Sequence, residues 1–134
     1  MKKTYHGSCH CGAVKYSAVM DLAEGSGKCN CTYCSKTRSW ATRAEDFKIL
    51  SGEESLADYG KDWGDGNLHH RFCKSCGTNL YGHGHIPEAG GDWLAVNIST
   101  LDDASIDELV GGPVRYMDGR NDNWMNPPAD TRHL

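Results

Sequence analysis

The sequence Cys73-Lys74-Ser75-Cys76-Gly77 places two cysteines three positions apart, immediately before a glycine. A tight turn of this kind directs both sulfur atoms toward one zinc ion, and the glycine can adopt the positive φ that the turn needs. A redox-active pair with the same spacing is the alternative, but it would begin a helix. Residues 68–72, which begin with Leu68 and end with Phe72, are instead predicted to form a strand that leads into Cys73. We therefore expect a zinc knuckle at this position.

The other five cysteines form two further clusters, so that none of the seven is isolated. These clusters are Cys9-His10-Cys11 and Cys29-Asn30-Cys31-Thr32-Tyr33-Cys34. Seven cysteines cannot all pair as disulfides, and residues 1–10 lack the apolar run of a secretory signal. We expect a cytoplasmic location, where closely spaced thiols are typically metal ligands. The sequence therefore predicts bound metal rather than disulfides.

Seven thiolates divide most simply into a group of four and a group of three. A zinc ion with four protein ligands is closed and structural, whereas one with three keeps a position for water or substrate. The middle cluster can supply three sulfur atoms by itself, which would leave the two outer clusters to share the other ion. The spacing alone leaves this grouping open. Zinc is preferred over a mononuclear iron site, which would use the same ligands.

Composition and charge argue against two classes of function. The formal net charge is -4 and the 14 basic residues are scattered along the chain, which argues against a nucleic-acid-binding surface. No apolar stretch approaches the roughly 20 residues of a membrane span. The chain has 16 glycines and only 2 phenylalanines, so bulky core material is scarce. Metal sites would therefore contribute to the stability of the fold.

Short apolar runs separated by glycine-containing turns predict an antiparallel all-β architecture in one domain over residues 1–134. The predicted strands cover residues 13–19, 47–50, 56–59, 68–72, 79–81, 93–98 and 114–117. Residues 62–67 and 82–91 are expected to form exposed loops. Helix is predicted only at residues 103–110, with Asp102 or Asp103 as its cap and Gly111 after its end.

These motifs resemble those of the glutathione-dependent formaldehyde-activating enzymes, a family whose relatives include centromere protein V. The resemblance rests on residues 7–12, 29–34 and 71–80, with further support from residues 45–47, 51–52 and 96–103 and from Trp124. It implies stacked antiparallel sheets, often called a β-tent. It also implies a structural zinc ion on Cys9, Cys11, Cys73 and Cys76, and a catalytic zinc ion on Cys29, Cys31 and Cys34.

A zinc ion with three thiolate ligands favours a soft fourth ligand, so a substrate thiol can bind there as its thiolate. We therefore expect an enzyme of the carbon–sulfur lyase class that adds a small thiol such as glutathione to formaldehyde or a related small carbonyl compound. A non-catalytic module in which both zinc ions only hold the fold is the alternative. A protein histidine or carboxylate at the fourth position would favour the module.

The residues that move protons and bind substrate are less well defined by the sequence. His10, His69, His70, His83 and His85 are candidate proton carriers by residue type alone, and His83-Gly84-His85 is better explained as a flexible turn than as a third metal site. Lys36, Arg38 and Arg43 are candidates to face the carboxylates of glutathione, although solvated surface charges are the simpler interpretation. Trp40 either lines the same pocket or packs in the core.

Overall fold

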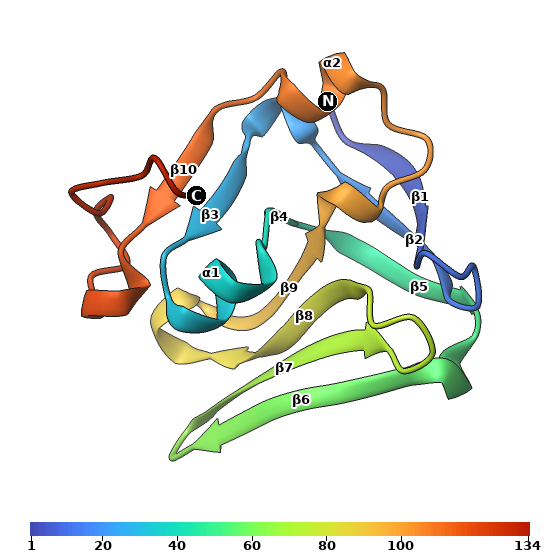
Figure 1. Ribbon diagram of the computed structural model, residues 1–134, viewed down its shortest axis with the longest axis horizontal. Coiled ribbons are helices and arrows are strands. Elements are labelled where there is room, and N and C mark those ends of the chain that lie inside the picture. Colours follow the sequence, from blue (N-terminus) through green and yellow to red (C-terminus); the bar gives the residue numbers. More distant parts are fainter.

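The computed structural model describes residues 1–134 and consists mainly of β-strands (Figure 1). The strands are Lys3–Ser8 (β1), Lys15–Met20 (β2), Ser26–Cys29 (β3), Ala41–Arg43 (β4), Glu45–Ser51 (β5), Leu56–Trp63 (β6), Gly66–Cys73 (β7), Asn79–Ile86 (β8), Gly91–Asn97 (β9) and Val114–Met117 (β10). The two α-helices, Thr32–Thr37 (α1) and Ile106–Val110 (α2), are short. The predicted all-β class is confirmed.

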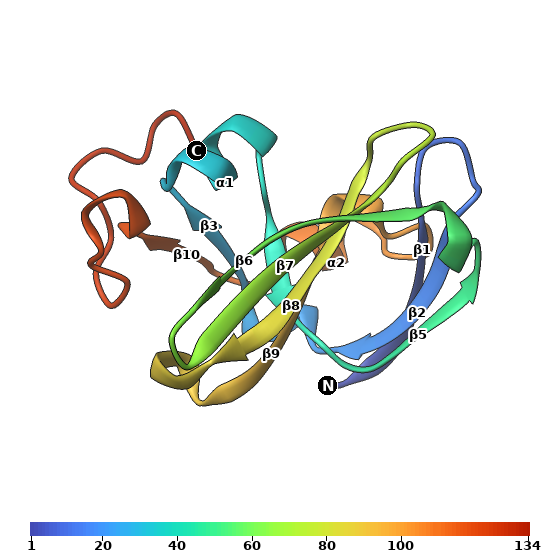
Figure 2. The same cartoon turned by 90° about the horizontal axis from the view of Figure 1, so that it is seen from below.

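The strands form two sheets. The smaller sheet has the order β1-β2-β5, and the larger has the order β10-β3-β4-β9-β8-β7-β6. Figures 1 and 2 show the smaller sheet at one side of the molecule, and β3, β10 and the C-terminal segment at the opposite side. Neighbouring strands are antiparallel as predicted, except that β10 pairs with β3 in parallel. These two strands lie far apart in the sequence, so no hairpin fixes their relative direction.

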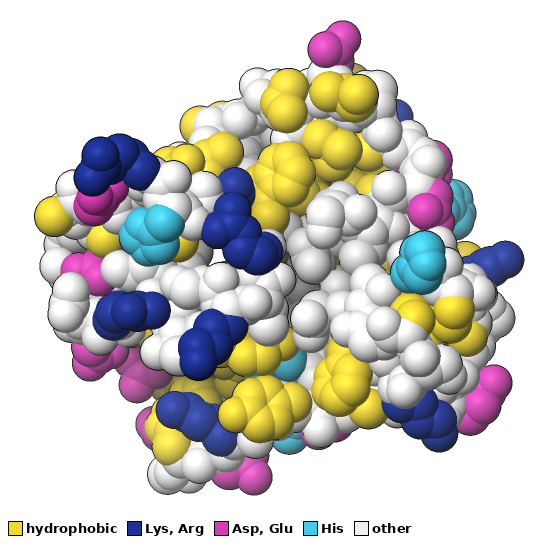
Figure 3. All heavy atoms as spheres, in the orientation of Figure 1, with side chains coloured by type: hydrophobic (Ala, Val, Ile, Leu, Met, Phe, Trp, Pro, Cys, Tyr) yellow, Lys and Arg dark blue, Asp and Glu magenta, His cyan; other side chains and the backbone are white.

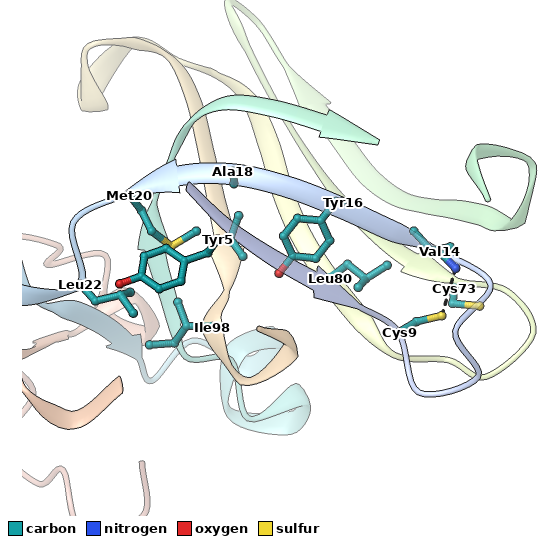
Figure 4. Packing of buried hydrophobic residues seen from close by; sticks show 11 residues of the cluster. Tyr5, Cys9, Val14, Tyr16, Ala18, Met20, Leu22, Cys73, Leu80 and Ile98 are labelled. Carbon is teal, nitrogen blue, oxygen red and sulfur yellow. Dashed lines mark hydrogen bonds between the residues drawn. The ribbon is translucent and has the colours of Figure 1, made fainter. Parts of the chain in front are cut away.

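The hydrophobic core lies where the two sheets face each other (Figure 4). Its largest fully buried side chains include Tyr16 and Met20 of β2 and Leu80 of β8. Cys9 and Cys73 belong to the same buried cluster, and Figure 4 shows both next to Val14 at one end of it. The backbone N–H of Val14 donates a hydrogen bond to Sγ of Cys9 over 3.3 Å. One end of the core is therefore made of cysteine sulfur.

The two predicted loops are mainly strand. β6 and β7 pair as far as Trp63 and Gly66, and β8 and β9 pair as far as Ile86 and Gly91, so only short turns remain at residues 64–65 and 87–90. The glycines of β8 are explained by close packing. A Cβ atom at Gly82 would lie 3.1 Å from the ring of Trp93, and one at Gly84 would lie 2.1 Å from the carbonyl oxygen of Asn67.

The predicted helix near residue 105 is present but shorter than expected. It begins after Ser105, whose hydroxyl accepts a hydrogen bond from the backbone N–H of Glu108, while the Glu108 carboxylate accepts one from the backbone N–H of Ser105. This reciprocal cap replaces the predicted Asp102 or Asp103 cap. Gly111 follows the helix as predicted. Neither helix of the chain has the length and apolar character needed to cross a membrane.

Candidate metal centres and active site

The first and third cysteine clusters meet at the end of the core. The Sγ atoms of Cys9, Cys11, Cys73 and Cys76 all lie within 4.8 Å of one another. Sγ of Cys11 lies 3.6 Å from Sγ of Cys9 and 3.7 Å from Sγ of Cys73. Sulfur atoms bound about 2.3 Å from one tetrahedral zinc ion are about 3.8 Å apart. The donor atoms and their spacing therefore fit zinc.

Two loops bring these four sulfur atoms together. The β1–β2 loop and the β7–β8 loop lie side by side in both Figure 1 and Figure 2. Gly12 and Gly77 each end a turn with positive φ, at 79° and 80°, and each donates its backbone N–H to the carbonyl of the cysteine that opens the turn. A Cβ atom at either glycine would have free space. The glycines are therefore needed for backbone conformation rather than for room, as the sequence predicts for Gly77.

The middle cluster forms a second sulfur group by itself. Cys29 ends β3, Cys31 is the N-cap of α1, and Cys34 lies in its first turn. Their three Sγ atoms lie within 4.8 Å of one another, and no histidine, carboxylate or fourth cysteine joins the group. Sγ of Cys29 accepts the backbone N–H of Cys31, and Sγ of Cys31 accepts that of Cys34, both over 3.3 Å. The structure thus brings the seven sulfur atoms together as four and three.

The charge balance of the three-sulfur group also favours a bound cation. Hydrogen bonds from the thiols of Cys29 and Cys34 lower the pKa of Cys31 to about 2. The hydrogen bond to Cys31 raises the pKa of Cys29, and those to Cys29 and Cys31 raise the pKa of Cys34. One thiolate therefore forms easily, whereas a second and third are opposed by the first. A divalent cation would offset this repulsion, which is how metal binding couples to thiol ionisation.

A buried asparagine fixes the chain between the first two cysteines of this group. The side-chain amide of Asn30 donates to Oδ1 of Asp118 over 2.8 Å, and its oxygen accepts the backbone N–H of Arg120 over 3.0 Å. The hydroxyl of Ser35 donates to the backbone carbonyl of Asn30. Nothing in the sequence signals this network, because Asn30 and Asp118 lie in distant segments.

The segment after β10 also lies directly against the three-sulfur group. A Cβ atom at Gly119 would lie 2.6 Å from Sγ of Cys29 and 2.5 Å from the ring of Trp124. Glycine is therefore required there by the close approach of the backbone to the sulfur. The indole N–H of Trp124 donates to Oδ1 of Asp122, so the ring is held over this part of the site.

His70 is the histidine that the structure associates with the three-sulfur group. Its ring stacks on that of Tyr33, which lies between Cys31 and Cys34, with 3.8 Å between the ring centroids. Partial burial lowers the pKa of His70 below its usual value. The hydroxyl of Tyr33 donates to Oδ1 of Asn79 on β8, which joins α1 to the larger sheet.

The other four candidate histidines have different surroundings. His69 and His85 bind the carboxylates of Asp58 and Asp92, over 2.8 and 3.0 Å. His10 is exposed, and the ring of His83 stacks on that of His69. The sequence His83-Gly84-His85 forms part of β8 instead of the expected flexible turn, and neither histidine belongs to a metal-binding group.

A small cavity that is open to solvent, with an enclosed volume of about 20 Å³, lies beside Cys29 and Cys34. Its walls include the side chains of Lys28 and Arg38, together with Ser39 and Leu134. Arg38 is thus the one candidate substrate-binding cation from the sequence that lines the cavity, whereas Lys36 and Arg43 do not. Lys28 was not a candidate.

Of the two roles predicted for Trp40, the structure shows packing in the core. Its ring packs against the hydrophobic core, and its N–H donates to the hydroxyl of Ser26 over 2.7 Å. The ammonium group of Lys28 lies over this ring, 5.4 Å from its centroid. Trp40 therefore supports the strand that carries Lys28 and does not line the cavity.

Comparison with known proteins identifies the family. The sequence profile of the glutathione-dependent formaldehyde-activating enzymes matches residues 4–111. The chain belongs to this family. The resemblance seen in the cysteine motifs is therefore confirmed, and the family match covers all seven cysteines. The segment around Gly119 and Trp124, which lies against the three-sulfur group of this family member, falls outside the matched residues.

A solved structure supports the same architecture. The crystal structure of a Rhodobacter sphaeroides protein is similar to this chain, with a TM-score of 0.63 and 26% sequence identity. The similarity covers 84% of this chain and 99% of the other.

Proposed function

We propose that the protein adds a small thiol, such as glutathione, to formaldehyde and that the reverse reaction makes it a carbon–sulfur lyase. In the forward direction the thiol loses its proton, a carbon–sulfur bond forms, and the carbonyl oxygen takes up a proton to give an S-hydroxymethyl product. Family membership supports glutathione and formaldehyde as reactants. The observation that carries the proposal is the inequality of the two cysteine groups, four sulfur atoms against three.

We further propose two zinc ions per chain, a structural ion on Cys9, Cys11, Cys73 and Cys76 and a catalytic ion on Cys29, Cys31 and Cys34. The catalytic zinc would lower the pKa of a substrate thiol and hold its sulfur near the carbonyl compound. Four thiolates complete a tetrahedral shell, whereas three leave one position for substrate. The four-sulfur group is partly embedded in the core, which suits a role in folding.

The protein's own residues give the three-sulfur group its shape. Backbone N–H groups of Cys31 and Cys34 hold two of the sulfur atoms, and the Asn30 network fixes the turn between Cys29 and Cys31. The chain around Gly119 and Trp124 shields one side from water. His70, with its lowered pKa, is neutral at pH 7, and neutral imidazole is the form that accepts a proton.

The direct test measures adduct formation by zinc-loaded protein. Exchange between free glutathione and its S-hydroxymethyl adduct is followed by NMR exchange spectroscopy after formaldehyde is added. We expect the protein to increase the exchange rate above the spontaneous rate in a concentration-dependent way. An unchanged rate would remove the proposed reaction and favour the non-catalytic zinc module.

Two serine variants test the division between the sulfur groups. Cys31→Ser is expected to abolish the rate increase while the thermal unfolding temperature changes little, because Cys31 lies outside the core. Cys76→Ser is expected to lower the free energy of unfolding by several kcal/mol, because loss of a structural zinc ligand removes folding energy. Circular dichroism melting of both variants checks this. Equal destabilisation by the two changes would contradict the assignment.

A further inference from the structure

Two cations line the cavity beside the three-sulfur group, and neither has a carboxylate partner. Lys28 lies next to Cys29 in the sequence, and Arg38 follows α1 directly. Neither takes part in any salt bridge of the structure. Figure 3 shows several Lys and Arg side chains on this face, in the region where Figure 1 places β3, α1 and the C-terminal segment. The mouth of the cavity is therefore suited to a negatively charged group.

The backbone at Arg38 is unfavourable for an arginine. Arg38 is the C-cap of α1 and adopts the left-handed conformation, with φ 57° and ψ 44°. Glycine is the usual residue in this position, and a side chain there costs of order 1 kcal/mol. The Arg38 guanidinium donates to the backbone carbonyl of His133, which holds the side chain at the cavity. Arg38 adopts an unfavourable backbone conformation, lies beside a cavity and has no acidic partner. These three features together indicate a role for its charge.

The size of the cavity limits what can occupy it. Its enclosed volume is only about 20 Å³, enough for one water-sized group, and the rest of the hollow is open to solvent. A thiol such as glutathione would therefore place only a carboxylate group at the mouth of the cavity, with the rest of the molecule outside it. Arginine and lysine are the side chains that bind carboxylates by charge-assisted hydrogen bonds.

The larger groove of the molecule does not suit an anion. This groove, of about 530 Å³, lies beside Cys9 and Gly77 of the two cysteine loops and is lined mainly by uncharged polar side chains. It contains no lysine or arginine, and it includes the carboxylate of Asp102 and the sulfur of Cys9. A carboxylate of the substrate would therefore be repelled there and attracted to Lys28 and Arg38.

We propose that Lys28 and Arg38 form a carboxylate subsite that selects thiol substrates carrying a carboxylate close to the sulfur. The inference rests on the proposed function in one respect, namely that the substrate sulfur lies at the three-sulfur group. The subsite would let the protein bind thiols that carry a carboxylate more tightly than neutral thiols. Neutral thiols reach the same sulfur group but gain nothing from the two cations.

The test compares glutathione with its diethyl ester, in which both carboxylates are neutralised. Isothermal titration calorimetry gives the Kd of each thiol for the metal-loaded protein. We expect the wild type to bind glutathione about tenfold more tightly than the ester, because a charge-assisted hydrogen bond contributes at this level. Arg38→Gly is expected to remove most of this preference and to leave the Kd of the ester unchanged. Arg38→Lys should keep part of it.

Two controls separate charge from folding. Lys36→Gln removes an exposed cation of α1 that does not line the cavity, and it should keep the preference for glutathione. Arg38→Gly should melt at the same or a higher temperature than the wild type, because glycine adopts the left-handed conformation freely. Any loss of binding in this variant is then due to the guanidinium group.

The results distinguish the subsite from the proposed function. Equal Kd values of the two thiols in the wild type, or equal weakening of both by Arg38→Gly, would overturn the subsite. The latter result would mean that the cations only offset the charge of the sulfur group. A normal preference for glutathione without any catalysed adduct formation would remove the proposed reaction and leave the subsite standing. If neither thiol binds, both proposals are wrong.

Discussion

Asn30 shows how one buried side chain joins segments that are distant in the sequence. Only 7% of its surface is exposed, and all its hydrogen bonds to Asp118 and Arg120 lie across the interface between the three-sulfur loop and the C-terminal segment. A buried amide that loses its partners carries a desolvation cost, so such a residue holds its neighbours firmly. We therefore regard Asn30 as the residue that positions Cys29 relative to Cys31.

Asn30→Ala is expected to lower the free energy of unfolding by about 1–3 kcal/mol, because the Arg120 N–H and the Asp118 carboxylate each lose a buried partner. Urea unfolding with an unchanged m-value checks this. Asn121→Ala is the matched control, since Asn121 also donates to Asp118 but is exposed, and its effect should be smaller. An equal or larger effect of Asn121→Ala would contradict the importance given to Asn30.

At the scale of single residues, the sequence predicts features that are set by neighbouring residues, but it does not predict contacts between distant segments. The sulfur groups follow from short spacings and from Gly77, whose turn is a local property. Lys28 could have been proposed from its place beside Cys29, but its role depends on Arg38 and the cavity. The association of His70 with Tyr33 depends on how α1 packs on the larger sheet, which no spacing reveals.

Among the elements, α2 is tied to β1 by a single carboxylate. Glu108 completes the capping box of α2, accepts hydrogen bonds from the Tyr5 hydroxyl and the Lys3 ammonium group, and so connects the helix to the smaller sheet. These hydrogen bonds, led by that of Tyr5, lower the pKa of Glu108 to about 2. The helix has two exposed apolar side chains and little burial of its own, so this connection is important for its position.

The lowered pKa of Glu108 predicts a specific loss of stability in acid. The contribution of Glu108 is fully present above its usual pKa of about 4.5 and is lost as the pH falls toward 2. Glu108→Gln should therefore be less stable than the wild type at pH 6, and the difference should shrink between pH 5 and 2. Urea midpoints measured across this range, with Asp107→Asn as control, check the prediction. A difference that stays constant with pH would contradict it.

The elements that sequence analysis missed have weak local signals. In β1 the inward-facing residues include Tyr5 and Gly7. Because glycine has no apolar side chain, the alternation of apolar and polar residues typical of a strand is not visible in the sequence. β3 has the sequence Ser-Gly-Lys-Cys, without any β-branched residue, and is held by its partners β10 and β4. α1 has no apolar face, and its first turn is set by Cys31 as N-cap. The strongly apolar β9, by contrast, was predicted almost completely.

The whole molecule places its two sulfur groups in different surroundings. The four-sulfur group closes one end of the core between two loops, whereas the three-sulfur group lies where β3 leads into α1, on the side of the molecule that also holds the C-terminal segment (Figures 1 and 2). On our proposal, a small chain with few bulky apolar residues gains folding energy from a metal ion bound by the first group. The second group lies close to a cavity with unpaired cations. This difference in surroundings supports the proposed division into a reactive site and a structural site.

The central claim is that the two groups bind one zinc ion each and that only the three-sulfur site accepts a thiol. Elemental analysis combined with zinc X-ray absorption spectroscopy of the freshly purified protein tests it most directly. We predict two zinc ions per chain with about 3.5 sulfur ligands per zinc on average, rising to about 4 when glutathione is added. A single zinc ion per chain, or a sulfur number that glutathione does not change, would contradict the account.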